Sequence, residues 1–380
     1  MTAPLVDRRT VIAKTRPYSR IAVIGAGAWG TALASVARRA GRDVTLWGRD
    51  ADVVRGITSQ NRNHRYLPDI DLPAGIRATT DMAEALDRAD AVMVVTPSHT
   101  VREISREVAT HLEGKTAIAL CAKGVEIGTG RLLANVAAEE MPGHPVGAIS
   151  GPTFAHETAK AYPTAVTVAF DFSHDDRINP GESTAARFAL SLSSETFRPY
   201  ISDDLTGVEI GGAVKNVIAI ACGMMTGAGF AENTRAALIA RGMDEMKALA
   251  EMLGGRRETI TGLSGAGDLT LTCSSRTSRN MSLGIQLGQG IVRDACFEGR
   301  PVVVEGETNA VSVMDLAHRT GVSMPICEAV YRVLHEGADL RASFAHLWSR
   351  PIMAEPKALD IVIDHPSGKS TVEEFAGVFA

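Results

Sequence analysis

Residues 20–41 read RIAVIGAGAWGTALASVARRAG, and this segment restricts the fold more than any other part of the chain. Its apolar beginning predicts a short buried strand, and its alanine-rich second half predicts a helix that ends before Gly41. Between them, Gly25, Gly27 and Gly30 form a G-x-G-x-x-G turn. Glycines at this spacing let the backbone approach a pyrophosphate, which then rests on the helix N-terminus. The segment predicts the first βα unit of a dinucleotide-binding sheet; a turn without ligand, or another doubly wound nucleotide site, is the alternative.

Further apolar runs continue this alternation of strand and helix. They lie at 43–48, 89–97, 115–124, 147–153, 163–170 and 195–202. The alternation predicts an α/β fold with a doubly wound parallel sheet of Rossmann type. The polar segment 171–183 predicts a surface loop between the last two strands. From Thr206 onward, long segments rich in alanine and leucine predict a mostly α-helical second domain.

The length of 380 residues is sufficient for two domains. We expect a basic N-terminal extension at 1–18, an NAD(P)-binding Rossmann domain at 19–205, a helical substrate-binding and catalytic domain at 206–345, and a peripheral C-terminal tail at 346–380. The extension lacks the apolar stretch of a secretory signal, so we expect a floppy basic arm or, as the alternative, a transit peptide.

Charge and cysteine usage exclude several classes of protein. A formal net charge of −5 argues against a general nucleic-acid binder. The five cysteines are scattered without a C-x-x-C pair, which indicates a reducing compartment with free thiols and no metal site. The most apolar run, 207–225, is interrupted by Lys215 and Asn216. The cost of inserting a lysine into lipid favours a buried helix over a membrane span.

Lys215 and Asn216 are unusual inside such an apolar run, because a buried ammonium without a partner is costly. Burial lowers the pKa of a lysine, which suits proton transfer near neutral pH. Gly211 and Gly212 precede the pair and leave room for a ligand, and Asp268 would orient the ammonium. The alternative is a core-helix lysine whose ammonium extends to solvent.

Two basic residues follow predicted strands, where ligands of such sheets collect. Arg49 occupies the end of the second strand, where an acid usually binds the ribose 2′-OH of NAD. An arginine there can pair with the 2′-phosphate of NADP, so we expect NADPH to be accepted. Lys123, in CAKGVE, would reach a phosphate or polarise a substrate oxygen. For both residues the alternative is a solvated surface charge.

Ser278, Arg279 and Asn280 begin a further predicted helix that ends near Leu287. Ser278 predicts an N-cap, and an arginine in the first turn opposes the helix dipole. A bound phosphate would remove that conflict, because helix N-termini and arginine both favour anions. A capped helix with a solvated arginine is the alternative.

Eight motifs occur in order: GAGAWGTALA, NRNHRYLPDIDLP, KGVE, SGPTFAHE, GGAVKNVIAIACGM, GAGDLTLTC, SRN and VVEG. Together they resemble the NAD(P)-dependent glycerol-3-phosphate dehydrogenase family of bacteria, over about residues 19–340. The resemblance implies reduction of dihydroxyacetone phosphate to sn-glycerol 3-phosphate with NAD or NADP, supplying glycerophospholipid synthesis. It also implies a cytoplasmic, usually dimeric enzyme.

The resemblance makes Lys215 the proton donor or acceptor. With the glycine turn, the expected cofactor contacts are Gly25, Gly27, Ala28, Trp29, Gly30, Arg49, Lys123, Ala155, Arg279, Val303 and Glu305. The expected substrate contacts are Lys123, Gly151, Thr153, Lys215, Asp268, Ser278, Arg279 and Asn280. Ala28 departs from the family, where a serine is common, so one hydroxyl contact is lost. The N-terminal extension, 171–183 and the tail exceed the family's usual length and have no expected role.

The resemblance implies hydride transfer from nicotinamide to the ketone carbon, with Lys215 protonating the developing alkoxide. Arg279 and Asn280 would hold the substrate phosphate. One alternative is another two-domain dehydrogenase of a hydroxy or oxo acid, such as a ketopantoate-reductase-like enzyme, and the SRN and GAGDL motifs count against it. The other is a non-enzymatic nucleotide sensor, which would need neither Lys215 nor an anion site.

Overall fold

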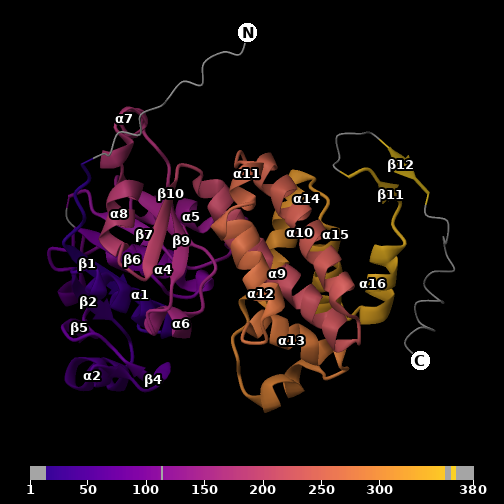
Figure 1. Ribbon diagram of the computed structural model, residues 1–380, viewed down its shortest axis with the longest axis horizontal. Coiled ribbons are helices and arrows are strands. Elements are labelled where there is room, and N and C mark those ends of the chain that lie inside the picture. The colour runs from indigo at the N-terminus through magenta and orange to yellow at the C-terminus, as the bar shows by residue number, and fades with distance from the viewer. Residues whose placement is uncertain (1–13, 113, 356–360, 365–380) are drawn as a thin grey trace, which may run out of the picture.

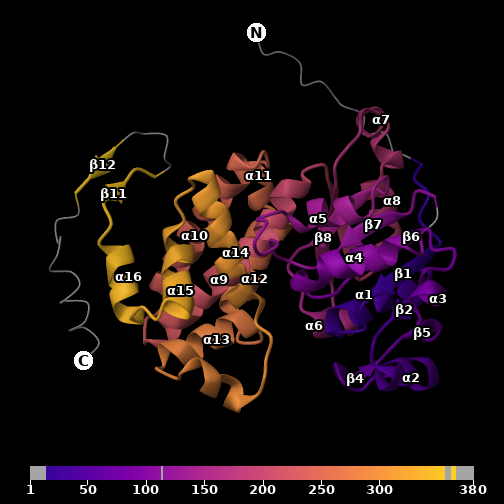
Figure 2. The same cartoon turned by 180° about the vertical axis from the view of Figure 1, so that it is seen from behind.

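The computed structural model describes residues 14–112, 114–355 and 361–364. A sheet domain and a helical domain lie side by side (Figure 1), and the view from behind shows the same separation (Figure 2). The sheet domain ends with strand β10, Phe197–Ser202, and the helical domain begins with helix α9, Leu205–Gly227. The predicted change from an α/β pattern to a helical pattern is therefore confirmed.

The sheet has eight strands in the order β10-β9-β8-β7-β6-β1-β2-β5. Their bounds are β1 Arg20–Ile24, β2 Asp43–Trp47, β5 Ile76–Thr79, β6 Ala91–Val94, β7 Ala117–Leu120, β8 Val146–Ser150, β9 Thr164–Phe170 and β10 Phe197–Ser202. Every pairing is parallel except that of β8 with β9. The doubly wound, mostly parallel sheet is thus confirmed, and β9 and β10 run opposite to the other strands.

Helices cover both faces of this sheet. The helices of the sheet domain are α1 Ala28–Arg39, α2 Ala51–Gln60, α3 Met82–Leu86, α4 Val101–Ala109, α5 Leu133–Glu140, α6 Ala155–Ala159, α7 His174–Ile178 and α8 Thr184–Leu192. A separate antiparallel ribbon joins β3, Arg62–Asn63, to β4, Leu67–Asp71. In β1, Ile21 and Val23 belong to one hydrophobic cluster, whereas Ala22 and Ile24 belong to the cluster on the opposite face. This two-sided burial explains the continuous apolar run.

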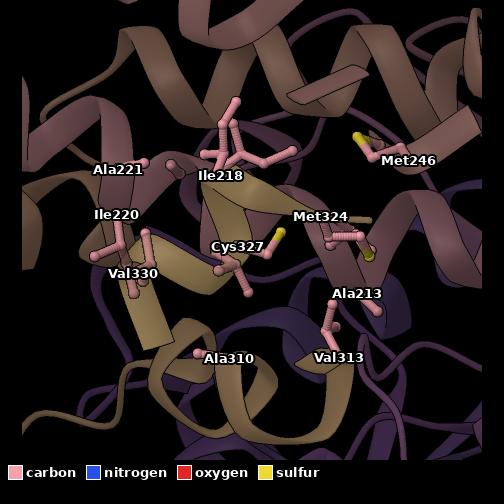
Figure 3. Packing of buried hydrophobic residues seen from close by; sticks show 14 of the residues in the cluster. Ala213, Ile218, Ile220, Ala221, Met246, Ala310, Val313, Met324, Cys327 and Val330 are labelled. Carbon is pink, nitrogen blue, oxygen red and sulfur yellow. The ribbon is translucent and has the colours of Figure 1, made fainter. Parts of the chain in front are cut away.

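The helical domain packs around α9. Its other helices are α10 Glu232–Met252, α11 Arg257–Ile260, α12 Asp268–Ser274, α13 Arg279–Gly288, α14 Glu305–Thr320, α15 Pro325–His335 and α16 Leu340–Trp348. Figure 3 shows side chains from α9, α10, α14 and α15 meeting in one core. Gly223 lets α9 approach α13 closely, because a Cβ there would lie 2.3 Å from the carbonyl oxygen of Met281. Small residues in the apolar run therefore serve close helix packing.

Among the described residues, α9 is the one helix that is long and apolar enough to cross a membrane. Its most apolar window is 94% buried inside the protein. The Asp204 carboxylate caps its first turn by accepting a hydrogen bond from the backbone N–H of Gly207 at 2.9 Å. α9 is therefore the core helix that Lys215 and Asn216 indicated.

The segments that exceed the family's length are partly ordered by local contacts. The expected loop at 171–183 contains α7 and a 3₁₀ turn, because Ser173 and Asp176 cap α7 reciprocally. In the N-terminal extension, Tyr18 is buried against Phe188, so its described end is not a free arm. In the tail, β11, Ile352–Met353, pairs with β12, Val362–Ile363, on the side of the helical domain away from the sheet (Figure 1). Residues 1–13, 356–360 and 365–380 lie outside the described residues.

Candidate active site

The glycine turn joins β1 to α1 at the carboxyl edge of the parallel strands. Gly25 has φ of +123°, and a Cβ at Gly30 would lie only 1.8 Å from the carbonyl oxygen of Gly25. Both positions therefore require glycine. At Gly27 an added Cβ would meet no atom within 4 Å, so the turn is open on that side. The first turn of α1 has no side-chain cap and no acidic residue, which leaves its N–H groups for a phosphate.

A buried oxygen next to this turn also fits a ligand. Thr96 follows β6, and a Cβ at Gly25 would lie 3.4 Å from its methyl carbon. Its Oγ1 is buried and has no hydrogen-bond partner within the described part of the chain. β1 and β6 are neighbours where the strand order reverses, the place where such sheets bind dinucleotides. The residues present therefore fit a dinucleotide.

Ala28 and Trp29 begin α1, and Arg49 follows the adjacent strand β2. Arg49 is exposed, and its side chain makes no hydrogen bond or ion pair with the residues described. The neighbouring Asp50 is fully engaged, because it caps α2 and binds Arg65 at 2.7 Å. A basic group, rather than an acid, is therefore the free charge at the end of β2.

Two lysines from different domains meet on one carboxylate. Lys123, which follows β7, places its Nζ 2.6 Å from Oδ2 of Asp268 and 3.4 Å from the carbonyl oxygen of Gly151. Lys215, on α9, donates to Oδ1 of Asp268 at 2.7 Å and to Oγ1 of Thr272 at 2.8 Å. The cluster therefore lies where the sheet edge meets α9 and α12.

Burial controls the charges of this cluster. Lys215 is 7% exposed and Asp268 is 1% exposed. Burial lowers the pKa of Lys215, the Asp268 carboxylate opposes that effect, and the Lys123 ammonium adds to it. Burial alone would raise the pKa of Asp268, but the two ammonium groups outweigh it and hold that pKa below its usual value. Two ammonium groups therefore meet on one buried carboxylate, and the Glu305 carboxylate is a second anion that raises the pKa of Lys215.

Asn216 belongs to a chain of side-chain amides beside the lysines. Its Nδ2 donates to Oε2 of Glu305 at 3.3 Å, and its Oδ1 accepts from Nδ2 of Asn280 at 2.9 Å. Oδ1 of Asn280 accepts from the backbone N–H of Gly306 at 2.9 Å. The amides therefore join α9, α13 and the N-terminus of α14, and the second N–H of Asn280 has no partner among the residues that the structure describes.

Arg279 lies at the first turn of α13, as the sequence predicts. Ser278 is the N-cap of that helix and accepts a hydrogen bond from the backbone N–H of Met281 at 3.2 Å. The exposed Arg279 guanidinium donates to the carbonyl oxygen of Val303 at 2.8 Å. Arg279, which is expected to bind the phosphate, therefore lies next to Val303, which is expected to contact the cofactor.

The segment between β8 and α6 carries three expected site residues. The carbonyl oxygen of Gly151 accepts from Lys123 and, at 3.3 Å, from the hydroxyl of Thr153. Ala155 begins α6, which packs against α1. The structure thus places these residues between the lysine cluster and the helix of the glycine turn.

Sequence reasoning missed Thr272 and Asn309. Thr272 lies one helical turn after Asp268 and accepts from Lys215, so its spacing on α12 was the signal that could have identified it. Asn309 lies one turn after Glu305 on α14 and donates to backbone carbonyls of both domains. Asn309 is one of several polar residues on α14, and nothing in its local sequence indicates that it contacts both domains.

A Rossmann-type sheet with an open glycine turn, joined to a helical domain that contributes a buried lysine, defines a two-domain NAD(P)-dependent dehydrogenase. Family models described as the N-terminus and the C-terminus of NAD-dependent glycerol-3-phosphate dehydrogenase match residues 20–175 and 204–345. The chain belongs to this family.

Similar proteins match this chain over nearly their full lengths. The chain is 45% identical to the glycerol-3-phosphate dehydrogenase [NAD(P)+] of Rhodospirillum rubrum over 350 residues, covering 92% of this chain and 97% of that protein. It is 46% identical to the protein of that name from Parvibaculum lavamentivorans, covering 90% and 99%. The crystal structure of the Coxiella burnetii glycerol-3-phosphate dehydrogenase superposes with a TM-score of 0.79 at 38% identity, covering 87% and 99%.

Proposed function

We propose that this protein reduces dihydroxyacetone phosphate to sn-glycerol 3-phosphate with NAD(P)H, and catalyses the reverse reaction. The observation that carries the proposal is the meeting of Lys123 and Lys215 on Asp268 at the domain boundary. Family membership favours this activity over another hydroxy- or oxo-acid dehydrogenase, and over a nucleotide sensor without catalysis.

The cofactor would rest on the glycine turn, with further contacts from Trp29, Ala155 and Glu305. When bound, the nicotinamide supplies a hydride to the ketone carbon of the substrate. The available guanidinium of Arg49 supports acceptance of NADPH, since it can pair with a 2′-phosphate. We assign residues 19–205 to cofactor binding, 206–345 to substrate binding and catalysis, and 346–380 to a peripheral tail.

Lys215 is the proposed acid in the reductive direction. Its ammonium protonates the alkoxide that develops on the substrate oxygen, and it accepts that proton in the reverse direction. Burial lowers the pKa of Lys215 and so makes proton release easier, while Asp268 keeps the ammonium oriented. Lys123 adds positive charge near the same oxygen, which stabilises the developing negative charge.

Arg279 and Asn280 are proposed to hold the substrate phosphate at the N-terminus of α13. The exposed guanidinium of Arg279 and the buried amide of Asn280 both belong to the first turn of α13, beside its backbone N–H groups, and all three favour anions. A fixed phosphate places the ketone carbon at a constant distance from Lys215. Gly151 and Thr153 would line the opposite side of the substrate.

We further propose a cytoplasmic homodimer that supplies glycerol 3-phosphate to phospholipid synthesis. Five free, buried cysteines support a reducing compartment. The assignment to lipid synthesis and the dimer rest on the family resemblance.

One spectrophotometric assay tests the proposed activity. Purified protein is mixed with NADPH or NADH and dihydroxyacetone phosphate, and cofactor oxidation is followed, with ketopantoate as the control substrate. We expect oxidation with dihydroxyacetone phosphate and none with ketopantoate. Oxidation with ketopantoate alone would assign the chain to the alternative dehydrogenase class, and binding of NADPH without turnover of either substrate would indicate a sensor.

A further inference from the structure

Asn309 connects the two domains beside the lysine cluster. It lies on α14 and is 1% exposed. Its Nδ2 donates to the backbone carbonyl of Lys123 in the sheet domain at 3.4 Å and to that of Ala213 on α9 at 3.1 Å. Ala213 precedes Lys215 on the same helix, so one amide group contacts the backbone of both lysine-bearing segments.

These contacts fix Lys123 at several points along its length. Its backbone is held by Asn309, and its Nζ is held by Asp268 and the carbonyl of Gly151. Its stem lies close to Gly212 of α9, because a Cβ added there would lie 3.2 Å from Cγ of Lys123. A shift of the backbone at 123 would therefore move the ammonium relative to Asp268.

The amide of Asn309 carries a cost as well as its two hydrogen bonds. Oδ1 of Asn309 is buried and has no hydrogen-bond partner among the residues described. A buried acceptor without a partner costs free energy, which partly offsets the two hydrogen bonds that the same amide donates. Gly124 faces this oxygen, since a Cβ there would lie 2.9 Å from it, so the adjacent backbone leaves space for the amide.

We propose that Asn309 is a positioning residue for the reaction, which holds Lys123 against α9 so that both lysine ammonium groups meet on Asp268. The inference rests on the proposed function wherever turnover is measured. Asn309 acts through Lys123, and this role requires no contact between Asn309 and the substrate.

A double-mutant cycle tests this coupling. Asn309→Leu, Lys123→Met and the double variant are compared, with Asn309→Ala as a second variant should leucine disturb folding. We expect Asn309→Leu to lower kcat about 10- to 100-fold, in line with the effect of a small misplacement of a catalytic group. In the Lys123→Met background the same substitution should have almost no further effect. Equal effects in both backgrounds would overturn the proposal.

Ser312→Ala is the matched control. Ser312 is buried on the same helix, and among the described residues its hydroxyl bonds within that helix alone, to the carbonyl of Asn309 at 3.4 Å. We expect this variant to keep the wild-type kcat. A purely structural role for Asn309 would lower the melting temperature of Asn309→Leu while leaving kcat of the folded protein unchanged, and that result would also overturn the proposal.

A measurement without cofactor or substrate separates this inference from the proposed function. Trace labelling with acetic anhydride over a pH series, read by mass spectrometry, gives the pKa of Lys215. Asp268, Lys123 and Glu305 are the charged groups that act on Lys215, and the Lys123 ammonium lowers its pKa. Asn309→Leu should therefore raise the pKa of Lys215, and an unchanged value would contradict the inference even in a protein that turned over no dihydroxyacetone phosphate.

Discussion

The Nζ of Lys215 lies 2.7 Å from Oδ1 of Asp268, with both groups buried at the domain boundary. Burial favours the neutral amine and the carboxylate favours the ammonium, so the two effects oppose each other on one proton. An acid under opposing effects can hold its proton in the resting enzyme and release it to a nearby oxyanion.

Asp268→Asn should lower the kcat of reduction about 10- to 100-fold at neutral pH. Without the carboxylate, burial and Lys123 lower the pKa of Lys215 further, so less of the acid form is present. The pH profile of kcat for reduction should shift to lower pH. Asp244→Asn, which removes a carboxylate paired with Arg241 on α10, is the control and should keep the wild-type profile. An unshifted profile for Asp268→Asn would show that the carboxylate does not set the charge of Lys215.

Two substitutions in the glycine turn should distinguish a loss of stability from a loss of cofactor binding. Gly30→Ala would place a Cβ 1.8 Å from the carbonyl oxygen of Gly25, so we expect a large loss of melting temperature. Gly27→Ala has open space around the new methyl group and should keep the wild-type melting temperature. That methyl group would nevertheless obstruct a pyrophosphate and raise the Kd for NADPH at least tenfold. Tight NADPH binding by Gly27→Ala would place the cofactor elsewhere.

Glu245 should make stability depend on pH. It is buried on α10 and accepts hydrogen bonds from the backbone N–H groups of Ile326 and Cys327 at the start of α15, and burial raises its pKa to about 7. The folded protein therefore holds this proton more tightly than the unfolded chain. Its contribution to stability is complete below the unfolded pKa and is lost as pH rises through about 7, by at most about 3 kcal/mol.

Glu245→Gln removes this titration. Urea unfolding of both proteins at pH 5 and pH 8 should show a smaller loss of unfolding free energy for the variant across that interval. Parallel losses in the two proteins would mean that the carboxyl group does not titrate in this range.

Arg49→Asp should change the choice of cofactor. The substitution replaces the available guanidinium after β2 with a carboxylate, which repels a 2′-phosphate and can accept a hydrogen bond from a ribose 2′-OH. The ratio of kcat/KM for NADPH over NADH should fall at least tenfold. Arg65→Ala, which removes a partner of Asp50 while keeping Arg49, is the control. A constant ratio in Arg49→Asp would mean that the guanidinium does not meet the cofactor.

Local patterns were sufficient to predict much of the fold. Each buried strand of the sheet is a short apolar run, and α1, which ends at Arg39, was predicted to end before Gly41. β5 was missed because only its two end residues, Ile76 and Thr79, are buried, so no apolar run marks it. The antiparallel pairing of β8 with β9 was also missed, because strand direction is set by the path of the connection rather than by the strand's composition.

The individual residues of the site could be predicted from the sequence, but their arrangement in space could not. Lys123, Lys215 and Asp268 each lie in a recognisable motif, yet their convergence on one carboxylate depends on how the two domains pack. Thr272 and Asn309 were missed for the same reason, because their roles come from neighbours distant in sequence.

The kcat of Lys215→Met tests the central claim most directly. Methionine keeps the length and packing of the side chain and removes its proton, while Lys247→Met on α10 controls for the loss of a lysine elsewhere in the helical domain. NADPH binding, followed by fluorescence titration, should stay near the wild-type Kd, and the kcat for reduction of dihydroxyacetone phosphate should fall about 10²- to 10⁴-fold. A kcat within a few-fold of the wild-type value would contradict the assignment of Lys215 as the proton donor.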